Sequence, residues 1–313
     1  MRWARVPEME IALHLGLHRT GSTALQQTLR RQRAMLEADG VVFWGPDQMR
    51  RPGFAGLASA NTAGAEAALV SRARAELHQA CDHARQIGRR MFLISEENIP
   101  GVILRNFSAA RLYPDAGRKL AAFRARLPQP PARIVLALRD YAEYWPSAYA
   151  QALTNREMPP FEPDRLVEGT AVRGWPAVVG DISAVFPEAR ITLWRHAGGR
   201  GGFRPVLAAV FGDTLARRLA LADGGVNRAL SRQALERLVQ LRAAGQLPAS
   251  GAARRQRMEE LRAMGGAPFR PFIDDQAATL TRQFEADWAA LSSGAVPAVE
   301  AIEAPRAGIA GAA

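Results

Sequence analysis

The stretch EIALHLGLHRTGST, residues 10–23, decides the fold. Residues 10–17 form a short apolar run that predicts a buried strand, and from Thr23 onward leucines recur at helical spacing. Gly16 and Gly21 stand between them, separated by four residues. A strand, a glycine turn and a helix N-terminus form an anion site, because the first N–H groups of a helix lack partners and its dipole is positive there. The stretch therefore predicts a loop that binds phosphate-like groups.

Polar donors are concentrated in this loop. Arg19, Thr20, Ser22 and Thr23 fall within five positions. In P-loop NTPases a lysine after the second glycine reaches the β- and γ-phosphates, but here Ser22 occupies that position. A triphosphate would lose its main cation, whereas a cradle for two phosphate-like groups would remain. The alternative is a glycine turn with a purely structural role.

The rest of the chain alternates strands and helices. Apolar runs predict strands at 41–43, 91–95, 133–138 and 190–194. Helical spacing predicts helices at 23–40, 69–84, 115–127, 204–220, 231–243 and 271–292, and residues 45–64 are typical of a long loop. Strands that are apolar on both faces favour a mostly parallel sheet covered on both sides. We expect an α/β, P-loop-type three-layer fold with a helical C-terminal part.

One domain accounts for most of the chain. We expect an N-terminal extension at 1–9, a single domain at 10–293 and a disordered tail at 294–313. No apolar run is long enough to span a bilayer, and no export signal is apparent at the N-terminus. With one cysteine, Cys81, disulfides within the chain are excluded, which favours a cytoplasmic location.

The charge of the chain favours an anionic partner. The formal net charge is +11, but the arginines are scattered along the helices, so we expect no specific nucleic-acid binding. The five histidines form no recognisable metal-binding pattern. A small anionic ligand is the simplest expectation.

The loop resembles the N-terminal signature of the sulfotransferases that use 3′-phosphoadenosine 5′-phosphosulfate (PAPS), especially the bacterial members. The match includes His14, Gly16 and the run from Arg19 to Thr23. The resemblance implies that the loop holds the 5′-phosphosulfate of PAPS, that Arg19 lies against the transferred sulfuryl group, and that no metal is required. The residues implicated in donor binding are His18, Arg19, Thr20, Gly21, Ser22 and Thr23.

A second motif of this family is an arginine at a strand end with a serine eight residues later, and both bind the 3′-phosphate. Arg139 and Ser147 have this spacing. Tyr141 stands where the family usually has proline, and Pro146 predicts that the helix starts later than in relatives and moves Ser147. A surface ion pair is the alternative role for Arg139.

The resemblance implies in-line transfer of the sulfuryl group to a hydroxyl or amine of an unidentified small-molecule, glycan or lipid acceptor, with adenosine 3′,5′-bisphosphate as product. Glu97, which follows the strand at 91–95, is the first candidate for the general base. Glu96 and His18 are the alternatives for this role. The non-catalytic alternative for Glu97 is a carboxylate that caps a helix or lies on the surface. Because FLISEE (92–97) also resembles a Walker B strand, a small-molecule kinase or NTPase stays open, as does a non-catalytic nucleotide-binding protein.

Overall fold

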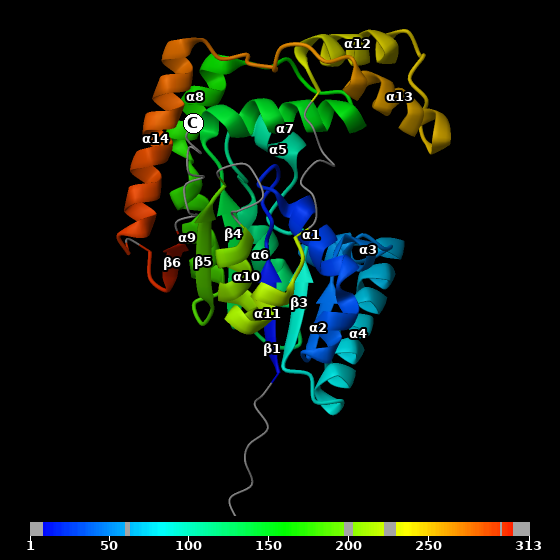
Figure 1. Ribbon diagram of the computed structural model, residues 1–313, viewed down its shortest axis with the longest axis vertical. Helices are drawn as coiled ribbons and strands as arrows, with labels where there is room; N and C mark the ends of the chain where they lie inside the picture. Colours follow the sequence, from blue (N-terminus) through cyan, green and yellow to red (C-terminus); the bar gives the residue numbers. More distant parts are fainter. Residues whose placement is uncertain (1–8, 60–62, 197–202, 222–229, 295, 303–313) are drawn as a thin grey trace, which may run out of the picture.

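A six-stranded sheet forms the centre of the computed structural model, which describes residues 9–59, 63–196, 203–221, 230–294 and 296–302. The strands are β1 (Glu10–His14), β2 (Val41–Trp44), β3 (Met91–Ser95), β4 (Arg133–Leu138), β5 (Arg190–Arg195) and β6 (Val299–Ile302). Their order is β2-β3-β1-β4-β5-β6, and every neighbouring pair is parallel. All carboxyl ends therefore meet at one edge of the sheet (Figure 1).

Helices account for most of the remaining described chain. They are α1 (Ser22–Arg31), α2 (Arg33–Ala38), α3 (Pro46–Met49), α4 (Gly64–Gln86), α5 (Ile103–Ala109), α6 (Ala116–Arg124), α7 (Tyr141–Asn155), α8 (Pro163–Val172), α9 (Trp175–Val185), α10 (Phe203–Phe211), α11 (Asp213–Arg218), α12 (Arg232–Ala243), α13 (Gly251–Ala263) and α14 (Asp274–Ser292), with a 3₁₀ turn, η1 (Ala55–Ala58). None of these helices is long and apolar enough to cross a bilayer.

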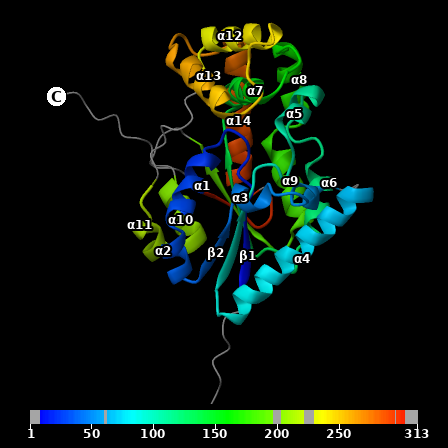
Figure 2. The ribbon, with the colours of Figure 1, turned by 90° about the vertical axis from the view of Figure 1, so that its right-hand side faces the viewer.

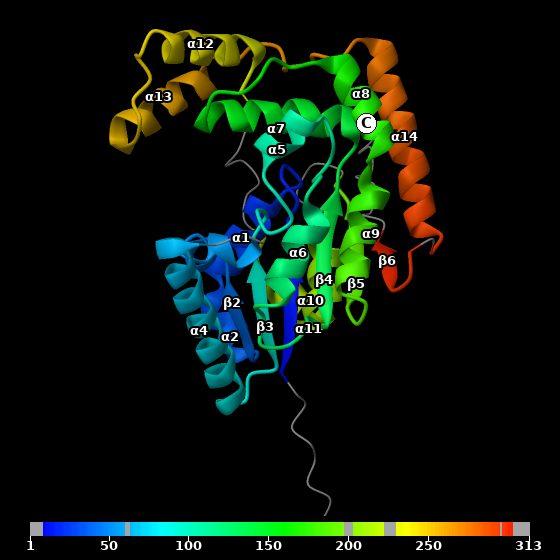
Figure 3. The ribbon, with the colours of Figure 1, turned by 180° about the vertical axis from the view of Figure 1, so that it is seen from behind.

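The two faces of the sheet bury alternate residues of each strand. On one face, residues such as Ala12, Leu93 and Val135 pack against α1, α2, α10 and α11. On the other, Leu13 and Ile94 pack against α4, α6, α9 and α14. Figures 2 and 3 show these helices on opposite sides of the sheet. The predicted three-layer α/β fold is confirmed, with a sheet that is parallel throughout.

A helical cap lies over the carboxyl edge. Its separate apolar cluster joins α7 to α12 and α13 through Leu153, Leu238 and Met258, among others (Figure 1). Arg242 donates to the carbonyls of Leu153 and Arg156, which lie at the end of α7. These contacts hold the C-terminal end of α7 against the cap, while Ser147 on its second turn contacts Arg19 of the glycine loop.

Several sequence predictions differ from the structure. The tail expected to be disordered from residue 294 contains β6, which pairs with β5. The loop at 45–64 contains α3 and η1. Helices α5, α8, α9 and α13 were not predicted; on α13 only Met258 and Leu261 are buried. Finally, α7 does not start late: Asp140 caps its N-terminus by accepting from Ala142 N, and the helix continues through Pro146.

Candidate anion-binding site

The loop between β1 and α1 has the conformation that its glycines predict. Gly21 is the N-cap of α1 at φ 85°, in the left-handed region, and Arg19 also has a positive φ of 63°. Gly16 is required for a different reason: an added Cβ would lie 2.4 Å from Ser22 Oγ and 2.6 Å from His14 Cε1. The first backbone bonds of α1 run from Ala24 and Leu25 to Gly21 O, so the preceding N–H groups of the turn make no bond within the helix.

Arg19 and Arg139 converge on one hydroxyl. Arg19 Nε donates to Ser147 Oγ at 2.7 Å, and Arg139 Nη1 donates to the same oxygen at 3.2 Å. Arg139 Nη1 also donates to the carbonyl of Arg19 at 2.9 Å. Trp175 Nε1 holds the carbonyl of Arg139 at 2.8 Å. The two motifs, separated by more than a hundred residues in sequence, thus form a single site.

This site carries positive charge that nearby carboxylates balance only in part. The ion-pair partner of Arg139 is Glu143, whose side chain is 62% exposed, so solvent weakens the pair. Burial and the neighbouring Arg139 lower the pKa of Arg19, while Glu97 opposes this change. Two guanidinium groups this close favour an anion between them.

The hydroxyls of the loop do not all face a ligand. Thr20 Oγ1 donates to the carbonyl of Leu17, and its side chain is buried. Ser22 Oγ is also buried and makes a long 3.4 Å bond to the same carbonyl. Thr23 is exposed on the first turn of α1. Thr20 therefore stabilises the loop itself, whereas Thr23 is open to a ligand.

His18 is buried behind the loop with both ring nitrogens engaged. Nδ1 lies 2.8 Å from the hydroxyl of Tyr113, and Nε2 lies 3.2 Å from Oδ1 of Asn98. In the tautomer that suits these partners, Nε2–H donates to Asn98 and Nδ1 accepts from Tyr113. Burial lowers the pKa of His18, which favours the neutral ring. This arrangement suits a residue that supports the loop better than a general base.

The two carboxylates that follow β3 share an arginine that the sequence did not single out. Arg50 forms two hydrogen bonds to Glu96, at 2.9 and 3.2 Å, and one to Glu97 Oε1 at 3.1 Å. Glu96 is further occupied by the backbone and side chain of Asn98. The Oε2 atom of Glu97 has no hydrogen bond to any described residue. Of the three candidates for the base, only Glu97 retains an unoccupied oxygen near Arg19.

Two further histidines belong to this edge of the sheet. His14 Nδ1 lies 2.7 Å from Ser95 Oγ, while its buried Nε2 has no partner among the described residues. His196 directly follows β5 and faces Gly21. Burial lowers the pKa of each ring to about 4, so both are neutral near neutral pH. Sequence spacing gave no sign of His196, because its neighbours come from other segments.

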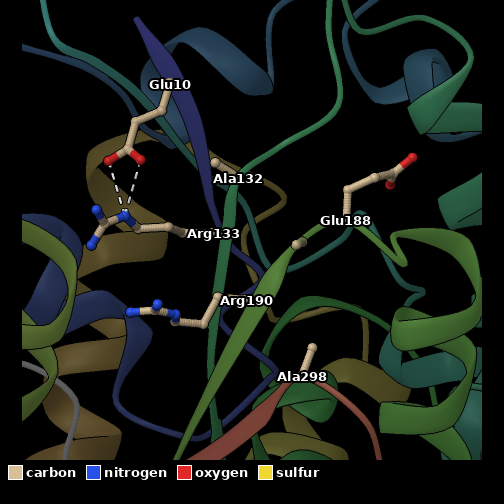
Figure 4. Close-up of a pocket in the computed structure, with 7 residues that line it drawn as sticks. Glu10, Ala132, Arg133, Glu188, Arg190 and Ala298 are labelled. Atoms are coloured by element: carbon tan, nitrogen blue, oxygen red, sulfur yellow. Dashed lines mark hydrogen bonds and ion pairs between the residues drawn. The ribbon is translucent and has the colours of Figure 1, made fainter. Parts of the chain in front are cut away.

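A cavity of about 440 Å³ lies at the opposite, amino-terminal edge of the sheet. Figure 4 shows its lining residues, including Arg190 and the ion pair between Glu10 and Arg133. Open parallel sheets bind ligands at their carboxyl ends, and the predicted donors all lie there. We therefore place the candidate site at the carboxyl edge, because Arg19 and Arg139 lie together there, and not because of the size of a cavity.

Within the described part of the chain, no group of three or more His, Cys, Asp and Glu side chains is arranged to hold a metal ion. The chain matches no model of a known protein family, no curated protein and no solved structure.

Proposed function

We propose that this protein is a sulfotransferase that moves the sulfuryl group of PAPS to a hydroxyl or amine of a small-molecule, glycan or lipid acceptor. The main support for the proposal is that Arg19 and Arg139 both donate to Ser147 Oγ. The resemblance implies one set of contacts for the 5′-phosphosulfate of PAPS and another for its 3′-phosphate. A single site with two cations and a helix N-terminus is suited to a ligand with two anionic groups.

Each part of the donor has residues that suit it. The 5′-phosphosulfate would lie on the loop, with Arg19 and the N–H groups before Ala24 as donors. The 3′-phosphate would lie against Arg139 and Ser147. Ser147 Oγ already accepts from both arginines, so its own proton is available to a phosphate oxygen.

In the proposed reaction, an acceptor oxygen attacks sulfur in line, and the bond from sulfur to the bridging oxygen breaks. Adenosine 3′,5′-bisphosphate leaves with that bond's electrons, and Arg19 stabilises the charge that develops on the bridging oxygen. The acceptor proton passes to Glu97, whose Oε2 is unoccupied among the described residues, while Arg50 holds Oε1. Proton transfer of this kind contributes about 10²–10⁴-fold to a rate.

A cytoplasmic location belongs to the same proposal. Cys81, the single cysteine of the chain, is buried and unpaired, and a free thiol suits a reducing compartment.

Ligand-induced thermal stabilisation tests the donor without a known acceptor, because a ligand of the native state raises stability by RT ln(1 + [L]/Kd). We expect adenosine 3′,5′-bisphosphate to stabilise the protein more than ADP or ATP with magnesium. Arg139→Ala should weaken the bisphosphate about 10–150-fold, the equivalent of one charge-assisted hydrogen bond. Arg190→Ala is the matched control, since it removes an exposed arginine at the opposite edge of the sheet.

Three outcomes would contradict the proposal. Stabilisation by ATP with magnesium above the bisphosphate would favour a small-molecule kinase. Equal loss of affinity in Arg139→Ala and Arg190→Ala would mean that general charge attraction, and not this site, binds the ligand. Tight bisphosphate binding without transfer to any acceptor would favour a non-catalytic nucleotide-binding protein.

A further inference from the structure

We propose that His196 is a third ligand-contacting residue of the site, and that it takes up a proton when a sulfate or phosphate group binds beside Arg19 and Arg139. The inference rests on the anion site of the proposed function. It adds a residue that no motif indicated, and a dependence of binding on pH.

The position of His196 is set by the sheet. In the register of β4 and β5, Leu138 is opposite Arg195. His196 N then donates to Leu138 O at 2.7 Å, which continues the pairing by one residue and puts His196 beside Arg139. Its ring reaches the loop, since Cε1 is 3.3 Å from the place that a Cβ on Gly21 would take. His196 thus lies between the end of β4 and the glycine loop.

The ring of His196 is unoccupied. Among the described residues, neither ring nitrogen has a hydrogen-bond partner, in contrast to His18, whose two nitrogens are both engaged. The side chain is only partly exposed. The ring of Phe203 lies close to the same position of Gly21 and offers no polar atom. An anion seated in the loop is therefore the group best placed to meet an imidazole nitrogen.

Burial and two neighbouring arginines keep His196 neutral when no ligand is bound. Burial lowers its pKa most, and Arg139, at the end of β4, and Arg19, in the loop, lower it further, to about 4. No carboxylate among the described residues acts on the ring. A bound anion would offset both arginines and accept a hydrogen bond from the imidazolium, and each effect raises the pKa.

Proton linkage then fixes the sign of the pH dependence. Between the pKa of the free protein, about 4, and the higher pKa of the complex, binding takes up a proton. Affinity for the anion therefore rises as the pH falls, by up to about tenfold per pH unit for one proton. Inorganic sulfate is the better probe for this effect, because phosphate groups titrate themselves near pH 6.

The experiment measures sulfate affinity by calorimetry from about pH 8 to about pH 5, in buffers of different ionisation enthalpy, so that proton uptake is counted directly. We expect the wild-type protein to bind sulfate at least about tenfold more tightly at the acid end, with uptake of up to one proton. His196→Gln should bind sulfate with little pH dependence. His83→Gln, which changes an exposed histidine on α4, should behave like the wild type.

A measurement on the wild-type protein makes the test independent of variant folding. The Cε1–H resonance of His196 should titrate at higher pH in the presence of sulfate. If the His196 resonance titrates at the same pH with and without sulfate, the inference is overturned. It is also overturned if the sulfate affinity of His196→Gln depends on pH as in the wild type. The proposed function stands in both cases. If sulfate binding takes up a proton but adenosine 3′,5′-bisphosphate stabilises the protein no more than ADP, the role of His196 is supported and the proposed function is rejected. Absence of anion binding would reject both.

Discussion

Replacement of Gly16 by alanine tests the loop geometry directly. The new Cβ would lie 2.4 Å from Ser22 Oγ, 2.6 Å from His14 Cε1 and 2.8 Å from Ser22 Cβ. Neither neighbour can give way easily: His14 is held by Ser95 and stacks on Trp194, and Ser22 begins α1. Overpacking of this kind destabilises by about 1–3 kcal/mol, which lowers Tm by about 2–6 °C in a chain of this size.

The substitution also bears on function, because relief of the clash moves Ser22 and the N–H groups of the first turn. We expect weaker binding of adenosine 3′,5′-bisphosphate in addition to the loss of Tm. Gly180→Ala, in α9, is the matched control: nothing lies within 4 Å of its added Cβ, so alanine should stabilise the helix by about 0.5–1 kcal/mol. If Gly16→Ala is as stable as the wild type and binds equally well, the close approach of His14, Gly16 and Ser22 is refuted.

Three other predictions concern catalysis, core stability and pH. Glu97→Gln should lower turnover about 10²–10⁴-fold with bisphosphate affinity unchanged; unchanged turnover in a sulfuryl-transfer assay would exclude Glu97 as the base. Tyr141→Phe should destabilise by about 1–3 kcal/mol, since the hydroxyl donates to Asp287 Oδ2 and accepts from Trp175 N; urea unfolding that matches the wild type would contradict this. The pKa of His14 is lowered from 6.5 to about 4 by burial, so the unfolded chain binds the proton first. His14 should therefore contribute a fall of about 3 kcal/mol in the free energy of unfolding as the pH drops from 6.5 to 4, and a profile in urea that is flat over this range would contradict the buried, neutral ring.

The local features of the fold could be predicted from the sequence. The strands at 91–95 and 133–138 are continuous apolar runs, and both are strands in the structure with the same bounds. The glycine loop was recognisable from the spacing of its glycines, whereas the pair Arg139 and Ser147 was singled out by its resemblance to a family motif. Ser231 caps α12 by accepting from Ala234 N, a common role of serine at the start of a helix.

Contacts between distant segments could not be predicted in the same way. Arg50 reaches Glu96 and Glu97 from a segment that composition marked as a loop. His196 gains its place only because β5 pairs with β4. Pro146 misled the prediction of α7, because the capping bond from Ala142 N to Asp140 starts the helix before the proline. Tertiary packing sets the positions of Arg50 and His196, whereas a local capping bond outweighs the effect of Pro146.

Strand β6 changes where the protein can safely be shortened. It covers the outer edge of β5 through the sequence VEAI, a run of only four residues. A version that ends at residue 293, where composition marks the end of the domain, would lack this strand. The backbone donors and acceptors of β5 would then be open to pairing with another chain, a known route to aggregation. Expression of the protein in soluble form should therefore depend on a segment far from the proposed ligand and without any chemical role in the reaction.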